Sequence, residues 1–378
     1  MMSQKKRILL IYYKLFKAGG VAKVFINLAN VLSEKGYQVD ILLLMSERPH
    51  FYPLNPEVKV HNIDTFSHWA WKICEINIKY FKFIPKIRNL NAYIYHIGVF
   101  LMIKKWMKKH HQHYDTIISS WYKLSSFLAL NKKVNFKTIA WEHVTYQTGG
   151  IIYRDILRRY YKNLKAIVCI NSPSINYYKK YNKTYFIPNI IGEPFDKQQH
   201  IDFEKKEQTI SFVGRLDMEK NVKALLEIFE ETKINPHWKL QIIGDGNERK
   251  NLEEFASQKL KDRVIFYGTK TSDEIAELLK KSKIFAFTSL KEALPTVLVE
   301  AMFCGNAIIS YQCNYGPADI ITKKTGFLIP LHDKEYFKEK LQLLANDNEV
   351  LHQYMQHAFE ESQNWKREKI IQKWEVIL

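Results

Sequence analysis

Cysteine is scarce in this chain of 378 residues, which holds only Cys74, Cys169, Cys304 and Cys313. None forms a Cys-x-x-Cys pair, so the sequence argues against a structural zinc site and indicates a reducing compartment. No apolar run approaches the roughly 18 residues that a membrane-spanning helix needs. The run from Ile8 to Tyr13 is too short for the core of a signal peptide, and it predicts a first buried strand instead.

Acidic residues are scarce in the first half of the chain. Residues 1–190 hold 30 Lys and Arg against 9 Asp and Glu, whereas residues 191–378 hold 27 against 30. The net charge of +18 therefore resides in the first half. This asymmetry favours an anionic partner for that half, either nucleic acid or a membrane surface, because a generally basic composition would spread the charge evenly.

One segment, residues 66–113, combines nine Lys and Arg with ten aromatic residues and a single acid, Glu75. Basic residues interleaved with aromatic ones suit a helix that lies among lipid headgroups. The same mixture suits stacking on single-stranded nucleic acid. A third interpretation is that the aromatic residues belong to an ordinary core and the lysines to a solvated face.

Apolar strands alternate with helical patterns along the chain, which predicts the α/β class. In the first half we expect a helix over residues 21–35 and strands at 8–13, 39–44, 116–119, 138–141 and 166–170. In the second half we expect strands at 209–213, 239–243, 264–267, 284–287 and 307–310, with helices at 221–232, 247–258, 272–282 and 295–304. The alternation predicts two facing, Rossmann-like, doubly wound parallel sheets with a cleft at the carboxyl ends of their strands.

The most specific constellation is the segment from Thr288 to Gly305. Glu292 lies in a loop after a strand, Pro295 suits the first turn of the next helix, and Glu300 follows on that helix. The N–H groups at a helix start attract anions, and carboxylates accept hydrogen bonds from sugar hydroxyls. This corner therefore suits a ligand that carries both a phosphate and hydroxyl groups.

Basic residues and glycines follow other strands of the second half. Arg215 comes directly after a strand and Lys220 precedes the next helix, so both are placed to bind one diphosphate. Gly244 and Gly246 come at another strand end, where glycine lets the backbone approach a ligand closely.

These motifs resemble the retaining glycosyltransferases of family four, which have the GT-B fold. The resemblance rests on five segments of the second half, namely GRLDMEKN, IIGDGNE, FYGTK, EALPTVLVE and TGFLIP. It implies an N-terminal acceptor-binding domain, 1–190, and a C-terminal nucleotide-sugar-binding domain, 191–360. It also implies that the helix at 361–378 packs back on the N-terminal domain. The family usually has glycine after the first glutamate of the pair, where this chain has Ala293. Glycosyltransferases that bind a metal–diphosphate commonly carry Asp-x-Asp, which this chain lacks, so the resemblance favours a diphosphate site without a metal ion or other cofactor.

The resemblance also implies roles for individual residues. Arg215 and Lys220 match the pair that holds the donor diphosphate, Glu292 faces the donor sugar, and Glu300 binds the ribose. Further donor contacts are implied for the backbone of Gly20, Ala293, Leu294 and Thr296. His143 matches a histidine that reaches the donor sugar; without the resemblance, a buried histidine bonded to backbone is the simpler interpretation. An ion pair with a lysine is an alternative role for Glu142.

Together these observations predict a transferase of a hexose or N-acetylhexosamine from a nucleotide diphosphate sugar, with UDP-sugar favoured. The acceptor is expected to be a membrane-associated or lipid-linked glycan of bacterial cell-surface polysaccharide. We expect a cytoplasmic enzyme, peripheral on the inner face of the cytoplasmic membrane and without a nucleic-acid partner. The alternatives are a nucleic-acid-binding protein and an inactive glycosyltransferase-like scaffold.

Overall fold

The chain divides into two compact units in the computed structural model, which describes residues 6–16, 19–45, 49–81, 84, 87–197 and 200–378. Unit 1 comprises Met1–Ile187 and Ile371–Leu378, and unit 2 comprises Pro188–Ile370. The predicted boundary after residue 190 falls three residues from Ile187. Of the predicted C-terminal helical segment, residues 361–370 belong to unit 2 and residues 371–378 to unit 1.

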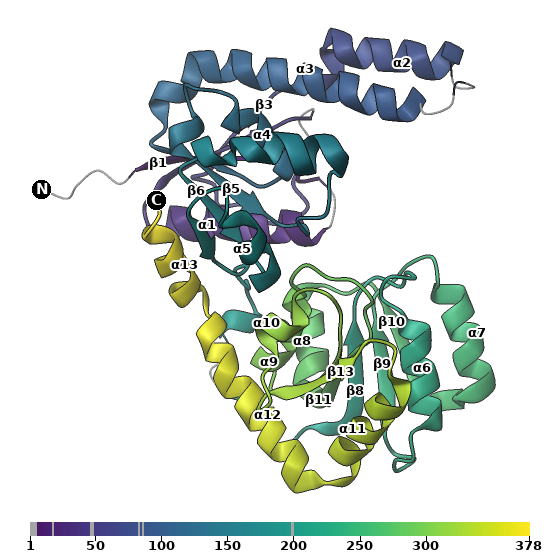
Figure 1. The fold of residues 1–378 in the computed structure, drawn as a ribbon. Helices are drawn as coiled ribbons and strands as arrows, with labels where there is room; N and C mark the ends of the chain where they lie inside the picture. The colour runs from purple at the N-terminus through teal and green to yellow at the C-terminus, as the bar shows by residue number, and fades with distance from the viewer. Residues whose placement is uncertain (1–5, 17–18, 46–48, 82–83, 85–86, 198–199) are drawn as a thin grey trace, which may run out of the picture. The chain divides into compact units, whose positions relative to one another are not determined.

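Unit 1 is built on a parallel sheet of seven strands in the order β3-β2-β1-β4-β5-β6-β7 (Figure 1). The strands are β1 (Arg7–Tyr12), β2 (Gln38–Leu43), β3 (Lys59–Asn62), β4 (Thr116–Ser119), β5 (Thr138–Glu142), β6 (Ala166–Cys169) and β7 (Thr184–Phe186). The longer helices are α1 (Gly20–Glu34), α2 (Trp69–Phe81), α3 (Ile87–His110), α4 (Tyr122–Ala129) and α5 (Ser172–Tyr178). Short helical turns cover Thr65–Ser67, His111–His113, Asn135–Lys137, Ile151–Ile156 and Leu157–Asn163.

Unit 2 is built on a parallel sheet of six strands in the order β10-β9-β8-β11-β12-β13. The strands are β8 (Glu207–Val213), β9 (Lys239–Ile243), β10 (Val264–Gly268), β11 (Ser282–Phe287), β12 (Ala307–Gln312) and β13 (Gly326–Pro330). The helices are α6 (Val222–Glu231), α7 (Arg249–Lys259), α8 (Ser272–Lys281), α9 (Thr296–Phe303), α10 (Pro317–Ile320), α11 (Lys334–Asn346) and α12 (Asn348–Ser362). Helix α13 (Arg367–Glu375) begins in unit 2 and ends in unit 1. Short turns cover Phe195–Lys197, Lys261–Arg263 and Gln363–Trp365. The α/β prediction with two doubly wound parallel sheets is confirmed.

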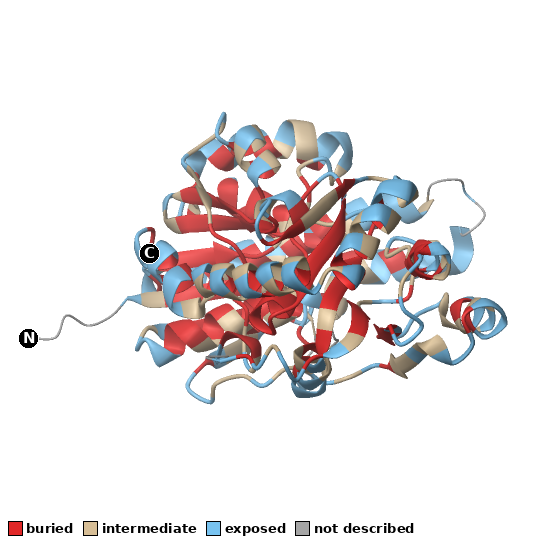
Figure 2. Cartoon of the chain, turned by 90° about the horizontal axis from the view of Figure 1, so that it is seen from below, coloured by how far each residue is buried: buried red, intermediate tan, exposed pale blue. Residues whose placement is uncertain are grey.

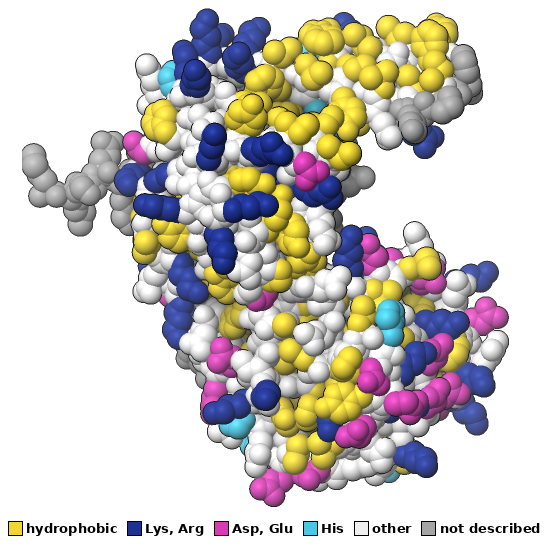
Figure 3. Space-filling model, in the orientation of Figure 1, with side chains coloured by type: hydrophobic (Ala, Val, Ile, Leu, Met, Phe, Trp, Pro, Cys, Tyr) yellow, Lys and Arg dark blue, Asp and Glu magenta, His cyan; other side chains and the backbone are white. Residues whose placement is uncertain are grey.

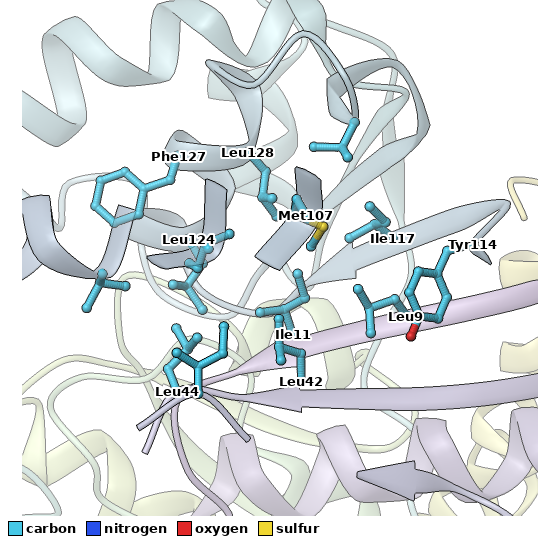
Figure 4. Packing of buried hydrophobic residues seen from close by; sticks show 14 of the residues in the cluster. Leu9, Ile11, Leu42, Leu44, Met107, Tyr114, Ile117, Leu124, Phe127 and Leu128 are labelled. Atoms are coloured by element: carbon cyan, nitrogen blue, oxygen red, sulfur yellow. The ribbon is translucent and has the colours of Figure 1, made fainter. Parts of the chain in front are cut away.

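The strands of both sheets are mostly buried, and the exposed residues lie on the outer faces of the helices (Figure 2). On one face of the first sheet, Leu9 and Ile11 of β1 pack with Leu42, Ile117 and the last turns of α3, where Met107 is fully buried (Figure 4). Successive side chains of a strand point to opposite faces of the sheet. Because helices cover both faces, the side chains on both sides of a central strand are buried and mostly apolar.

The last residues of the chain complete unit 1. Trp374 is fully buried, and its ring meets Trp141 of β5 edge-on with 5.2 Å between ring centroids. A large aromatic residue near the end of the chain therefore fills part of the core formed by the first half.

Candidate functional site

The strand order of the second sheet reverses between β8 and β11, which are direct neighbours. In open parallel sheets, ligands bind at the carboxyl ends of the strands where the order reverses. The loop after β8 carries Arg215 and Lys220, and the loop after β11 carries Glu292. The two loops are joined by hydrogen bonds: the amide of Leu290 donates to the carbonyl of Glu219 over 2.8 Å, and the Thr288 hydroxyl donates to the carbonyl of Asn221 over 3.1 Å.

Lys220 and Glu292, 72 residues apart in the chain, form an ion pair. Both side chains are largely buried, with exposed fractions of 18% and 12%. The Lys220 ammonium also lies 5.4 Å from the ring centroid of Phe287, the last residue of β11. The structure therefore brings together the predicted diphosphate cation and the predicted sugar-facing carboxylate at this sheet edge.

Arg215 extends outward from the same loop. Its guanidinium is 73% exposed and lies 3.0 Å from a carboxylate oxygen of Asp217. The other oxygen of Asp217 accepts the backbone N–H of Lys220 over 3.1 Å. Sequence reasoning missed Asp217, although its place between the two cations in Gly214–Asn221 was the available signal. A shallow hollow of about 380 Å³ lies beside Arg215, lined also by Met218, Glu219, Asn247 and Glu248.

Helix α9 begins next to Glu292. The helix begins one residue later than predicted, so Pro295 is its N-cap and not its first helical residue. Pro295 supplies no side-chain cap to the first-turn N–H groups. Thr296 is the first helical residue, Leu294 is buried, and Glu300 is buried within the helix with only 6% of its surface exposed. Ala293, at the position usually held by glycine, does not have a positive φ, so the departure from the family pattern causes no left-handed strain.

Gly244 and Gly246 have a packing role that the sequence did not reveal. A Cβ at Gly244 would lie 1.9 Å from the carbonyl oxygen of Gly214, and one at Gly246 would lie 2.3 Å from that of Leu216. The backbone approaching these glycines is the loop that carries Arg215, not a ligand. Their binding role stays a prediction, and their glycine identity is explained by the fold.

The two remaining predicted residues belong to unit 1. Gly20 is exposed at the first position of α1, and no described atom lies within 4 Å of where its Cβ would be. His143, directly after β5, is 5% exposed, and its ring centroid lies 4.1 Å from that of Trp141. Neither of its ring nitrogens has a hydrogen-bond partner among the described residues, so it is not held by backbone. The interdomain site that would join these residues to Lys220 stays a prediction.

The basic partner of Glu142 is an arginine and not the lysine that the sequence left as an alternative. It is buried beside Arg158, whose guanidinium lies 3.5 Å away, and it accepts hydrogen bonds from the hydroxyls of Tyr161 (2.7 Å) and Tyr178 (2.8 Å). All four side chains are buried, which explains the choice of partner: a planar guanidinium satisfies a buried carboxylate better than a flexible ammonium. This cluster stabilises the neighbourhood of His143.

The described residues hold neither a metal-binding cluster nor a membrane-spanning helix. No group of three or more His, Cys, Asp or Glu side chains in those ranges is arranged to hold a metal ion. Within the same ranges, none of the helices combines the length and apolar character needed to cross a bilayer.

Comparisons with known proteins bear on both units. The family model for Glycosyltransferase Family 4 matches residues 18–191, and the model for Glycosyl transferases group 1 matches residues 194–361. The amylovoran biosynthesis glycosyltransferase AmsD of Erwinia amylovora is 27% identical and covers 98% of this chain and 99% of its own. An α-1,4-N-acetyl-D-galactosaminyltransferase of Campylobacter jejuni, whose named acceptor is an undecaprenol-linked diphosphate glycan, is 25% identical over 94% of each chain.

Solved structures share the fold. The lipopolysaccharide outer core galactosyltransferase WaaB superposes with a TM-score of 0.75 at 17% identity, covering 98% of each chain. HepE of Anabaena in complex with UDP superposes with a TM-score of 0.72 at 14% identity, also over 98% of each chain. Two doubly wound parallel sheets with this likeness define a protein of the GT-B class. The chain belongs to the family-four glycosyltransferases, as the two family models on its two units show.

Proposed function

We propose that this glycosyltransferase transfers a hexose or N-acetylhexosamine from a UDP-sugar, with retention, to a lipid-linked or membrane-associated glycan in bacterial cell-surface polysaccharide biosynthesis. The observation that carries the proposal is the Lys220–Glu292 pair where the strand order of the second sheet reverses. The UDP bound to HepE and the polysaccharide and lipid-linked pathways in the names of AmsD and the Campylobacter enzyme support the donor and acceptor classes.

The chemistry follows from the charges at this edge. When the bond between the sugar and the diphosphate breaks, negative charge develops on the leaving phosphate. Lys220, Arg215 and the first N–H groups of α9 would stabilise that charge in place of a metal ion. No side chain stands out as a nucleophile, so the acceptor hydroxyl attacks from the face that the diphosphate leaves, and a phosphate oxygen takes its proton. Glu292, held by Lys220 before the donor binds, is then freed to accept a hydrogen bond from a sugar hydroxyl.

We predict that Lys220→Met and Arg215→Met each reduce turnover by about 10²–10³-fold, as loss of a donor to a developing anion does in other enzymes. The measurement is UDP release from UDP-hexoses and UDP-N-acetylhexosamines with EDTA present. Lys223→Met, which removes a lysine from α6 outside the site, is the matched control and should keep near-full activity. Full activity of both site variants with any accepted donor would contradict the proposal, and dependence on an added metal ion would contradict its metal-free form.

We further propose that unit 1 binds an anionic membrane surface through α2 and α3. The two helices lie side by side (Figure 1), and their facing sides are small or polar: the Asn91 side chain donates to the carbonyl of Cys74, and Gly98 approaches Ala70. Their outer sides are apolar instead (Figure 3). Exposed apolar residues recur at helical spacing on both helices, namely Trp69, Ile73, Ile76 and Tyr80 on α2 and Leu90, Tyr93, Ile97 and Leu101 on α3.

Charge supports a lipid surface as the occupant. The apolar stripe of α3 leads into exposed Lys104, Lys105, Lys108 and Lys109 at its carboxyl end. The single acid of the segment, Glu75, accepts a hydrogen bond from the indole of Trp71 over 2.8 Å. Apolar side chains that enter the acyl boundary and lysines that meet anionic headgroups are the two components of binding at a membrane interface. Residues 82–83 and 85–86 of the predicted basic aromatic segment lie outside the described residues.

The test is flotation with vesicles of phosphatidylglycerol and phosphatidylethanolamine at physiological salt. We expect the wild-type protein to float and Ile76→Ser/Ile97→Ser to bind about tenfold or more weakly, since each side chain loses the free energy of apolar burial. Phe136→Ser/Val376→Ser is the matched control, because these side chains of unit 1 are more exposed than the other pair but lie outside α2 and α3. Wild-type protein that stays unbound, or that dimerises through this surface or shifts single-stranded RNA instead, would overturn the proposal.

A further inference from the structure

The first sheet has its own reversal of strand order, between β1 and β4. Its carboxyl edge is the counterpart of the β8–β11 edge in unit 2, and the same rule predicts a ligand there. Tyr13 follows β1 directly, and Ser120 to Lys123 follow β4 and begin α4. Helix α3 contributes His96 to the same place, and the helical turn Ile151–Ile156 contributes Tyr153.

Lys123 is a half-buried cation without an acidic partner in the described part of the chain. Its ammonium lies 3.1 Å from Nε2 of His96, and 5.8 Å and 5.5 Å from the ring centroids of Tyr122 and Tyr153. Burial and the Lys123 charge lower the pKa of His96 to about 4, so the imidazole is neutral and accepts a hydrogen bond from the Lys123 ammonium at Nε2. Its one N–H is therefore at Nδ1, and the ammonium keeps two further N–H groups.

Unused polar atoms surround this pair. Nδ1 of His96, the hydroxyl of Tyr13 and the hydroxyl of Ser120 are buried without a hydrogen-bond partner among the described residues. Buried polar groups are almost always paired in native proteins, so each exception needs a reason. The ammonium and the imidazole N–H are donors only, and both hydroxyls can donate. A site that offers donors and a positive charge is complementary to an anion.

Two other buried or half-buried lysines, Lys206 and Lys137, are paired differently. Lys206 donates to the carbonyls of Ser282 and Cys304, each over 2.8 Å, and Lys137 donates to those of His111 and Tyr114, each over 2.6 Å. These lysines hold backbone segments together. Lys123 makes no such contact with backbone, so an architectural role does not account for it.

We propose that Lys123, oriented by His96, binds a phosphate group of a lipid-linked acceptor. His96 is adjacent to Ile97 of the exposed apolar stripe on α3, so one helix carries both the surface proposed to enter the membrane and the anion site. A lipid diphosphate has its charge at the headgroup level, where a cation beside a membrane-bound helix meets it. The inference rests on the proposed function, because it assigns the acceptor's anionic group to unit 1 while the donor diphosphate belongs to unit 2.

The test measures binding of geranyl diphosphate by isothermal titration, with saturating UDP present to occupy the donor site. We expect binding by the wild-type protein, a loss of about 10- to 100-fold in Lys123→Met, and recovery in Lys123→Arg, which keeps the charge. Lys133→Met is the matched control, because it removes an exposed lysine of unit 1 and should not change the affinity. UDP affinity should be unchanged in all variants, which shows that the donor site and the fold are intact.

Four outcomes would overturn the inference. Geranyl diphosphate that is displaced by UDP would belong to the donor site, which leaves the proposed transferase function intact. An equal loss in Lys133→Met would show a diffuse charge effect, and undiminished binding by Lys123→Met would remove Lys123 from the site. Inorganic pyrophosphate that binds as tightly as geranyl diphosphate would identify a site for free phosphate instead of a lipid-linked group.

Discussion

His143 is a titratable residue of unit 1 whose protonation the fold controls strongly. Complete burial lowers the pKa of its imidazole to about 3, from a usual value of 6.5. The ring lies against Trp141 and has no hydrogen-bond partner in the described ranges, so it enters the folded state only in the neutral form. A neutral imidazole at the carboxyl end of β5 can donate or accept a hydrogen bond without bringing charge to a sugar.

This depressed pKa predicts a pH-dependent stability. The unfolded chain takes up a proton at His143 near pH 6.5, whereas the folded chain does so only near pH 3. The unfolded state therefore binds more protons between these values, and stability is lost as the pH falls. Acidification from pH 7 to pH 4 should cost about 3 kcal/mol at this residue. We expect the unfolding free energy of His143→Leu, measured by urea unfolding, to fall by about 3 kcal/mol less than that of the wild-type protein over the same pH range. Identical pH profiles of the two proteins would contradict a buried neutral histidine.

Residue patterns predicted which residues follow β8 and β11 better than they predicted the contacts between those residues. The cations after β8 and the glutamate after β11 were predicted because both loops follow apolar strands. Their ion pair could not be predicted, since it joins residues 72 positions apart whose loops meet only once the strand order is known. The partner of Glu142 could not be predicted either. Arg158 lies on an irregular helical turn without a periodic pattern, so the sequence does not show that it meets the end of β5.

At the scale of elements, the strands with neighbours on both sides were predicted well, and three of the four described edge strands were missed. β4 and β9 match the prediction at both ends. β3, β7, β10 and β13 lie at sheet edges and pair on one side only, and of these β10 alone was predicted. Lys59–Asn62 is polar in part and Thr184–Phe186 has only three residues, so neither carries a signal that separates it from a loop.

Helices α2 and α3 show a second limit at this scale. The sequence indicated a basic and aromatic segment but left three interpretations open. The structure places some apolar residues of the segment in the core and others at the surface: Ile103 and Met107 belong to the core of unit 1, whereas Ile76 and Ile97 are more than half exposed. Apolar residues at helical spacing form one face of a helix, whether that face packs on the core or is exposed to another partner. The spacing alone therefore does not show which of the two it does. The polar contact between Asn91 and Cys74 decides it.

At the scale of the whole molecule, the boundary in charge along the sequence does not coincide fully with the division of the chain into two units. The excess of positive charge ends near residue 190, as the units do, but unit 1 also includes the last eight residues of the chain. This crossing, the return of the chain from unit 2 to unit 1 at its end, leaves no signal in the composition. It depends on Trp374, which is buried against Trp141; before the structure, only the family resemblance implied that the end of the chain packs on the first half.

That crossing makes the stability of unit 1 depend on a residue more than 180 positions from the rest of the unit. Trp374→Ala should destabilise unit 1 by about 3–5 kcal/mol, because it leaves a cavity next to Trp141 that the rigid strand β5 cannot fill. Pulse proteolysis in urea, with fragments identified by mass, should show earlier cleavage within residues 6–187 and unchanged protection of 200–370. Val376→Ala, at a position that is 79% exposed, is the control and should leave both midpoints in place. Equal loss of protection in both units would mean that the chain unfolds as one cooperative body, and unchanged protection of unit 1 would mean that the terminal helix contributes nothing to its core.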